Sequence, residues 1–307
     1  MQHTQLPQAH SRALPVSILL VNSLIWGLSW WPLKALQAHG WHPLWSTTLV
    51  FLLGTAAIAA FKPAAVSDLM RSPLLWMVGL ASGVTNGAFN WGIAVGDVVR
   101  VILLFYLMPI WAAILARVLL KEKISARVLV RIALALCGAA IVLRPEGGGI
   151  PLPSSAGDWL GLFGGMGFAL TNVMLRRAAN CQRDSRALAM FAGSAAIPGL
   201  VVLITSGGAI AAPNAFSPQV LGLIIALGSA MLVANFALQF AAARLPVNTT
   251  SVVMLTEVVF AAVSSVLLIG AVITLPMVAG GLLIVFSSLL SAMPDKRSAG
   301  KPVSASP

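Results

Sequence analysis

The sequence is poor in charge. Of its 307 residues only 9% are charged, whereas a soluble domain carries about 25%. By contrast, 59% are hydrophobic, and the mean hydropathy is +0.94. This composition excludes a soluble enzyme or binding module and predicts a polytopic membrane protein. The net charge of +11 does not predict a nucleic-acid-binding surface, because the basic residues lie in short segments between apolar runs.

The motifs of membrane-embedded enzymes and of ATP-driven pumps are also missing. There is no histidine cluster, HExxH sequence, glycine-rich phosphate loop or pair of acidic residues within one apolar run. The two cysteines, Cys137 and Cys181, fall in an apolar run and in an arginine-rich loop, so no disulfide is expected. We therefore expect no enzymatic activity, no catalytic residue, no cofactor and no bound metal. No Lys or Arg lies near the middle of an apolar run, which argues against strongly anionic substrates.

Ten apolar runs, joined by short connections, predict an all-α membrane protein with ten transmembrane helices. The first run is too long for the apolar core of a signal peptide and is expected to be retained. The runs are Leu14–Ala38, Pro43–Phe61, Pro73–Val95, Val98–Leu120, Ala126–Leu143, Trp159–Leu175, Ala187–Thr205, Val220–Ala243, Val247–Ile269 and Leu275–Met293.

The distribution of basic residues predicts the orientation of these helices. With the N-terminus placed inside, all but three of the 19 Lys and Arg residues fall on the inner side, and only Lys34, Arg100 and Arg144 fall outside. This bias predicts that both termini are cytoplasmic, N-in and C-in. The expected location is the bacterial inner (cytoplasmic) membrane.

The two halves of the chain resemble each other. At a shift of 149 positions, the segment that begins at Pro109 aligns with the segment that begins at Val258. The prediction is a first five-helix repeat at 14–145, a Gly/Pro/Ser-rich outer linker at 146–158, a second repeat at 159–293 and a cytoplasmic tail at 294–307. Five is odd, so the second repeat would be inverted. Inverted repeats are typical of alternating-access transporters, which bind substrate near the midplane between the halves.

Polar and aromatic residues recur at helical spacing within several runs. They fit either the lining of a central substrate cavity or hydrogen-bonded contacts between helices. Rows of glycine beside them favour close helix packing, and Trp31, Trp41 and Trp45 fit an interfacial belt. The candidate substrate-binding residues are Asn22, Trp26, Trp30, Ser82, Asn86, Asn90, Tyr106, Phe168, Thr171, Asn172, Asn235, Gln239 and Glu257.

Glu257 is the most informative of these candidates, because it lies near the centre of the run Val247–Ile269. A charge at the bilayer centre costs roughly 2.5 to 3.5 kcal/mol, so a carboxylate there usually marks a substrate or proton pathway. Glu257 could couple transport to protons, anchor a substrate ammonium group or serve only as a hydrogen-bonded structural residue. In the fourth run, Pro109 predicts a helix kink that frees a backbone carbonyl and could serve gating.

The segment MPIWAAILARVLLKEKIS, with Pro109 and Glu122, resembles the pattern of the drug/metabolite transporter superfamily, in its EamA-type ten-helix branch. The second half resembles the variant that begins Glu-Pro-Val-Phe, with Glu257 and Phe260 in place and Val258 where proline is common. The resemblance implies secondary transport of small metabolites, and within the family the chain is most similar to exporters of aromatic and neutral amino acids.

The expected function is therefore export of small metabolites, amino acids above all, by alternating access. Two alternatives stay open: a multidrug exporter of lipophilic cations, and a passive channel-like membrane protein. The expected partners are a small-molecule substrate and the lipid bilayer, without nucleic acid. The sequence does not determine the oligomeric state.

Overall fold

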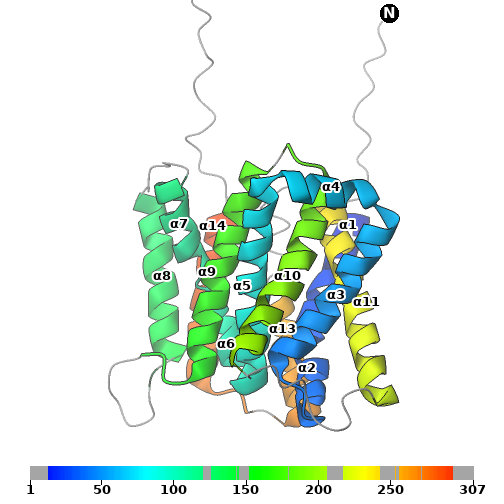
Figure 1. Ribbon diagram of the computed structural model, residues 1–307. Coiled ribbons are helices and arrows are strands. Elements are labelled where there is room, and N and C mark those ends of the chain that lie inside the picture. The colour runs from blue at the N-terminus through cyan, green and yellow to red at the C-terminus, as the bar shows by residue number, and fades with distance from the viewer. Residues whose placement is uncertain are drawn as a thin grey trace, which may run out of the picture.

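Helices form the described part of the chain, which contains no strand. The computed structural model describes residues 13–119, 126–142, 144, 152–178, 180–205, 217–242, 253, 256–270 and 272–292. Most helices stand side by side, and α4 lies across one end of the bundle (Figure 1). The helices are α1 (Ala13–Leu28), α2 (Trp30–Ala38), α3 (Pro43–Phe61), α4 (Pro63–Arg71), α5 (Pro73–Val95), α6 (Val98–Phe105), α7 (Met108–Leu119), α8 (Ala126–Val142), α9 (Ala156–Arg177), α10 (Arg183–Thr205), α11 (Pro218–Ala242), α13 (Thr256–Ile269) and α14 (Leu275–Ala292).

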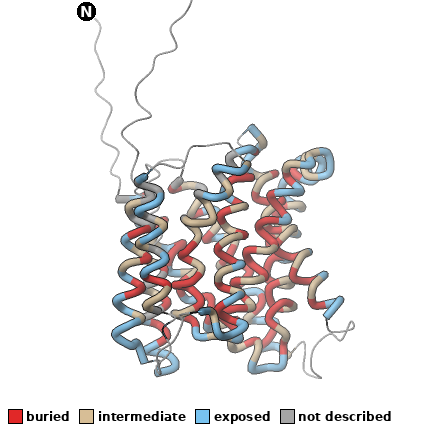
Figure 2. The backbone as a smooth tube through the Cα atoms, turned by 90° about the vertical axis from the view of Figure 1, so that its left-hand side faces the viewer, coloured by how far each residue is buried: buried red, intermediate tan, exposed pale blue. Residues whose placement is uncertain are grey.

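Five described segments are long and apolar enough to cross a membrane by length and composition. They are Leu14–Ala38, Pro43–Phe61, Arg100–Leu119, Arg183–Thr205 and Pro218–Leu238. Large apolar side chains are exposed on the outer faces of the helices, as with Ile204 at 72% and Leu267 at 77%, while buried residues gather inside the bundle (Figure 2). This arrangement fits a multi-pass membrane protein, because lipid tails rather than water would cover such faces.

Small residues set the packing around α5, which contacts both α9 and α10. A Cβ atom on Gly79 would lie 2.9 Å from the carbonyl oxygen of Ala189 in α10, and one on Gly167 of α9 would lie 3.0 Å from the backbone nitrogen of Thr85. The backbones of these helices can approach this closely only because glycine has no side chain. The glycine rows therefore serve helix packing, as the sequence favoured.

Contacts between the first and the second half of the chain follow a reciprocal pattern. Helix α1 packs against α11 and α13, and α9 packs against α5 and α6 in the same way. Helix α3 packs against α11, as α10 packs against α5, and α3 also contacts α10. Helices α8 and α14 pack against each other at the side of the bundle.

Helix boundaries agree with the sequence where local signals are strong. Helices α3 and α5 coincide with the predicted runs, and each has proline in its first turn. His42 caps α3 by accepting a hydrogen bond from the N–H of Leu44, and Ser72 caps α5 by accepting one from the N–H of Leu75. Such capping side chains satisfy amide groups that the helix itself cannot bond.

Two predicted continuous helices are interrupted. The first run turns at Ser29, whose hydroxyl donates a 2.7 Å hydrogen bond to the Trp26 carbonyl and competes with the helical ladder. The fourth run turns at Tyr106–Leu107 and so divides into α6 and α7. Pro109 follows this break, and its missing N–H leaves the Phe105 carbonyl without a helical partner.

One connection holds a helix, and one further expectation was wrong. Residues 62–72, which were expected only to be a short connection, contain the short helix α4, which starts at Pro63. Trp41, expected at the membrane interface, is only 1% exposed and belongs to the main core, whereas Trp31 is 50% exposed. An outer tryptophan next to a helix break can fold back into the bundle, which sequence position alone does not reveal.

Candidate functional site

Glu257 joins two helices from opposite halves of the chain. It lies in the first turn of α13 and is 9% exposed. The hydroxyl of Tyr106, at the C-terminal cap of α6, donates a 3.2 Å hydrogen bond to Glu257 Oε2. In the predicted run Val247–Ile269, Glu257 lies at the centre. The described helix α13 begins only at Thr256, because most of residues 247–255 lie outside the described part of the chain.

A chain of aromatic rings leads away from this pair. Phe105 lies beside Tyr106, with ring centroids 6.0 Å apart and the rings nearly perpendicular. Phe105 also contacts Phe168 of α9 at 5.5 Å and Phe89 of α5 at 4.8 Å, and Phe89 meets Trp26 of α1 at 6.3 Å. Four helices therefore present rings to one region, and both halves contribute.

Two buried amides close to this region have unused hydrogen-bonding groups. Asn22 of α1 is 1% exposed, and neither its amide oxygen nor its amide nitrogen has a partner among the described residues. Asn90, next to Phe89, is 3% exposed, and its Oδ1 has no partner in the described part of the chain. A buried polar group without a partner costs about 1 to 3 kcal/mol, so the structure retains these amides at a disadvantage that a ligand or water could remove.

Other candidates bond neighbouring helices instead. Asn86 Nδ2 donates a 2.9 Å hydrogen bond to Ser194 Oγ of α10, and Ser82 Oγ lies 3.0 Å from the same atom. Thr171 Oγ1 donates to the carbonyl of Gly167 in its own helix and lies 3.3 Å from Thr85 Oγ1. These contacts give the hydroxyl groups of Ser82 and Thr171 and the Nδ2 of Asn86 partners without a substrate.

The remaining candidates either have other surroundings or carry side chains outside the described part of the chain. Trp30 donates from Nε1 to Ser264 Oγ of α13 at 2.9 Å. Asn172 is exposed and bonds the carbonyl of Phe168 in its own helix. Asn235 is half-buried on α11. The side chains of Gln239 and Pro109 lie outside the described part of the chain.

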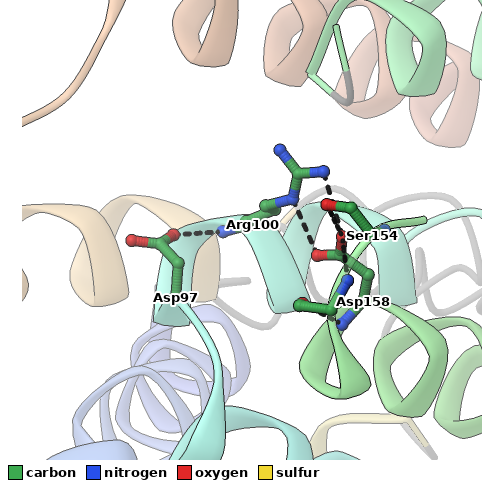
Figure 3. Close-up of polar contacts among 5 residues, drawn as sticks. Asp97, Arg100, Ser154 and Asp158 are labelled. Carbon is green, nitrogen blue, oxygen red and sulfur yellow. Dashed lines mark hydrogen bonds and ion pairs between the residues drawn. The ribbon is translucent and has the colours of Figure 1, made fainter. Parts of the chain in front are cut away.

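A second polar cluster lies at the end of the bundle opposite α4 (Figures 1 and 3). Arg100 of α6 donates from Nε to Asp158 Oδ1 at 2.7 Å and from Nη2 to Oδ2 at 3.0 Å. Asp158, in the first turn of α9, is 1% exposed, and its Oδ2 also accepts the N–H of Ser154 at 2.9 Å. Asp97 Oδ1 caps α6 by accepting the N–H of Arg100 itself.

The groups around Asp158 stabilise its negative charge. Burial alone would raise the pKa of its carboxyl group. The hydrogen bonds from Arg100 and from the Ser154 N–H, with the charge of Arg100, outweigh burial and hold the pKa below its ordinary value. The cluster is therefore an ionised, bidentate pair between helices of the two halves.

Sequence reasoning missed the partners in both clusters. Phe89 and Phe105 look like ordinary core residues in the sequence, and no local pattern joins them to Phe168. For Asp158 a signal existed: Ser155 lies three residues before it, and each side chain accepts the other's backbone N–H, which is a capping box. The pairing with Arg100 spans 58 positions and has no local signature. Within the described residues, no group of three or more His, Cys, Asp or Glu could hold a metal ion.

Comparisons with known proteins agree with this architecture. The sequence profile of the EamA-like transporter family matches residues 13–144. A solved structure titled only "Crystal structure of protein" has a TM-score of 0.58 over 92% of this chain and 97% of its own, at 18% sequence identity, and so shares the fold. No curated protein matches the chain in sequence. Residues 13–144 are therefore similar to EamA-like transporters, and this match together with the long apolar helices supports a multi-pass membrane protein.

Proposed function

We propose that this chain exports amino acids with aromatic or neutral side chains across the bacterial inner membrane, by alternating access and with both termini in the cytoplasm. The observation that carries the proposal is the buried hydrogen bond between Tyr106 and Glu257, which joins α6 to α13 beside a cluster of aromatic rings. A carboxylate kept within an apolar helix is costly unless it serves a pathway.

The chemistry of an amino acid fits the groups around this pair. Glu257 would accept hydrogen bonds from the substrate ammonium group, and the rings of Phe105, Phe89 and Trp26 would contact an apolar or aromatic side chain. Asn22, with an unpaired amide nitrogen, could donate to the substrate carboxylate. Its neighbour Ser23 bonds the carbonyl of Val253, so this part of α1 adjoins the beginning of α13.

The reciprocal helix contacts support the inverted-repeat part of the proposal. If α1, α3, α5, α6–α7 and α8 correspond in order to α9, α10, α11, α13 and α14, the contact of α1 with α11 has its counterpart in that of α9 with α5. The contact of α1 with α13 likewise corresponds to that of α9 with α6. The match to the EamA-like family, residues 13–144, also covers nearly the same residues as the predicted first repeat, 14–145. Such symmetry lets two halves exchange conformations around one central site.

A second candidate substrate class is supported by the same groups. A lipophilic cation would also pair with Glu257 and stack on the aromatic rings. Counterflow in proteoliposomes separates the two classes. Vesicles that contain the purified protein are loaded with unlabelled compound, and the uptake of labelled phenylalanine, leucine or tetraphenylphosphonium from outside is followed. We expect amino-acid counterflow, and cation counterflow without any amino-acid flux would refute the proposed substrate class.

The same assay tests the carrier mechanism and the role of Glu257. Unlabelled substrate inside the vesicles accelerates uptake by a carrier but not by a passive channel. Glu257→Gln should weaken amino-acid counterflow at least tenfold, while Asp184→Asn, at an exposed carboxylate of α10, should leave it unchanged. If Glu257 also couples protons, pH-driven transport should vanish in the Gln variant while exchange at equal pH survives in part.

A further inference from the structure

Helix α6 is a short, separate piece of the bundle. It contains eight residues, Val98–Phe105, and spans about 12 Å. The turn at Gly96–Asp97 precedes it, and the turn at Tyr106–Leu107 follows it. A rigid segment with a backbone break at each end can rotate while its neighbours stay in place, as hinged elements do in switching proteins.

The N-terminal end of α6 is fastened to α9 by the Arg100–Asp158 pair. Next to that pair the helix backbones touch: a Cβ atom on Gly161 would lie 2.8 Å from the carbonyl oxygen of Val101, and one on Gly157 would lie 2.7 Å from the Cα of Gly96. Val101 itself is fully buried. In this state the chain is closed between α6 and α9 at the end opposite α4, because no space separates the two backbones.

The C-terminal end of α6 is fastened to Glu257. Tyr106, the cap residue of α6, makes the hydrogen bond to that carboxylate, and Phe105 beside it contacts Phe89 and Phe168. Six residues separate Arg100 from Tyr106, which corresponds to a rise of about 9 Å along one rigid helix. A movement of Tyr106 away from Glu257 would therefore move Arg100 as well, because one rigid helix joins the two residues.

We propose that α6 is a gate helix, latched by Arg100–Asp158 and coupled through Tyr106 to the central Glu257. In the transport cycle proposed above, on which this inference rests, a substrate ammonium group at Glu257 replaces the Tyr106 hydroxyl. Helix α6 then loses its hydrogen bond to α13 while the latch at its other end remains, and α6 separates from α9 more often. Arg100 and Asp158 are positioning residues in this scheme, because they never touch the substrate.

The opening can be measured by chemical labelling. On a background of Cys137→Ser and Cys181→Ser, Val101→Cys places a thiol behind the latch. A membrane-impermeant maleimide, added from the side of the latch, should label it slowly. Arg100→Gln or Asp158→Asn should speed labelling about tenfold or more, because either change removes the bidentate ion pair that joins α6 to α9. The exchange Arg100→Asp with Asp158→Arg should restore part of the slow rate, because it restores the opposite charges but not the hydrogen bonds from the backbone of Ser154 and Ser155.

Controls separate a latch from a general loss of structure. Leu152→Cys, 61% exposed at the same end, should be labelled equally fast in every background. Lys62→Gln, which removes an exposed pair at the α4 end, should not change the labelling of Val101→Cys. Tyr106→Phe, far from the thiol reagent's entry, should speed labelling if the coupling through α6 exists.

The outcomes are distinct for the gate and for the substrate. Labelling of Val101→Cys that is equally slow in folded Arg100→Gln and Asp158→Asn proteins would overturn the latch, and an unchanged rate in Tyr106→Phe would overturn the coupling. If either Arg100→Gln or Asp158→Asn does not fold, the latch is tested with the other single variant and with the charge exchange. Labelling needs no transport, so a responsive thiol without amino-acid counterflow would refute the proposed substrate and leave the gate in place.

Discussion

Alanine at Gly193 should loosen the contact between α5 and α10. A Cβ atom there would lie closest to the carbonyl oxygen of Gly79 and 2.5 Å from its Cα, whereas ordinary contact begins at 3.4 Å. Relief of that overlap requires the two helices to separate by at least about 0.9 Å. The backbones meet directly here, so no flexible side chain can move aside instead.

Separation of the helices would also break hydrogen bonds next to Gly193. The hydroxyl of Ser194 lies 3.0 Å from Ser82 Oγ and 2.9 Å from Asn86 Nδ2. A shift of about 0.9 Å stretches both beyond 3.5 Å, the limit of a useful hydrogen bond, and costs roughly 1 kcal/mol for each. With about 1 to 3 kcal/mol for overpacking, the free energy of unfolding should fall by about 3 to 5 kcal/mol.

Thermal unfolding of the detergent-solubilised protein, followed by size-exclusion chromatography, measures this loss. Gly193→Ala should lower the midpoint by about 5 °C or more. Gly222→Ala is the matched control, because a Cβ atom at Gly222 in α11 meets nothing within 4 Å, and alanine in an open helix position should be neutral or slightly stabilising. Equal midpoints for the two variants would refute the argument from backbone contact.

Two further predictions concern the polar pairs. Tyr106→Phe removes the hydrogen-bond donor to Glu257 and should change the affinity for an amino-acid substrate about threefold to thirtyfold in counterflow. Phe163→Leu, which changes an exposed ring, is the control. If counterflow by Tyr106→Phe depends on substrate concentration as in the wild type, the hydroxyl has no role in binding. The lowered pKa of Asp158 means that its ionised form stabilises the folded state above the ordinary carboxyl pKa, and that this stability is lost as the pH falls through the lowered value. The difference in melting temperature between wild type and Asp158→Asn should therefore stay constant from about pH 8 to 5 and shrink only below about pH 4; a difference that changes between pH 6 and 8 would contradict this assignment.

The sequence predicted the helices well where caps and proline act locally. Helix α3 begins at Pro43 after the capping residue His42, and α8 and α14 begin at Ala126 and Leu275, the first residues of the predicted runs. The break at Tyr106–Leu107 was harder to predict, since Pro109 indicates a disturbance but not its position. The break at Ser29 depends on which partner its hydroxyl takes, and many serines in apolar helices do not interrupt them.

The candidate site was predictable only in part. Glu257 stands out in the sequence because a carboxylate in an apolar run is costly wherever it points. Its partner Tyr106 and the chain of rings through Phe105 depend on how helices 151 positions apart come together. Ser82 and Asn86 have the same helical spacing as Asn90, yet Ser82 Oγ and Asn86 Nδ2 bond α10, while the Oδ1 of Asn90 has no partner among the residues that the structure describes. Periodicity identifies a face of a helix, but only tertiary packing determines what that face contacts.

Helix α4 has a mechanical consequence for the bundle. It connects α3 to α5 across one end (Figure 1), and it packs against α10. Ser185 Oγ of α10 donates a 2.6 Å hydrogen bond to Asp68 of α4. This brace couples three upright helices, α3, α5 and α10, so that a tilt of one carries the others with it. The helices outside the brace are then the ones free to move in a transport cycle, and α6 is the shortest of those that the structure describes.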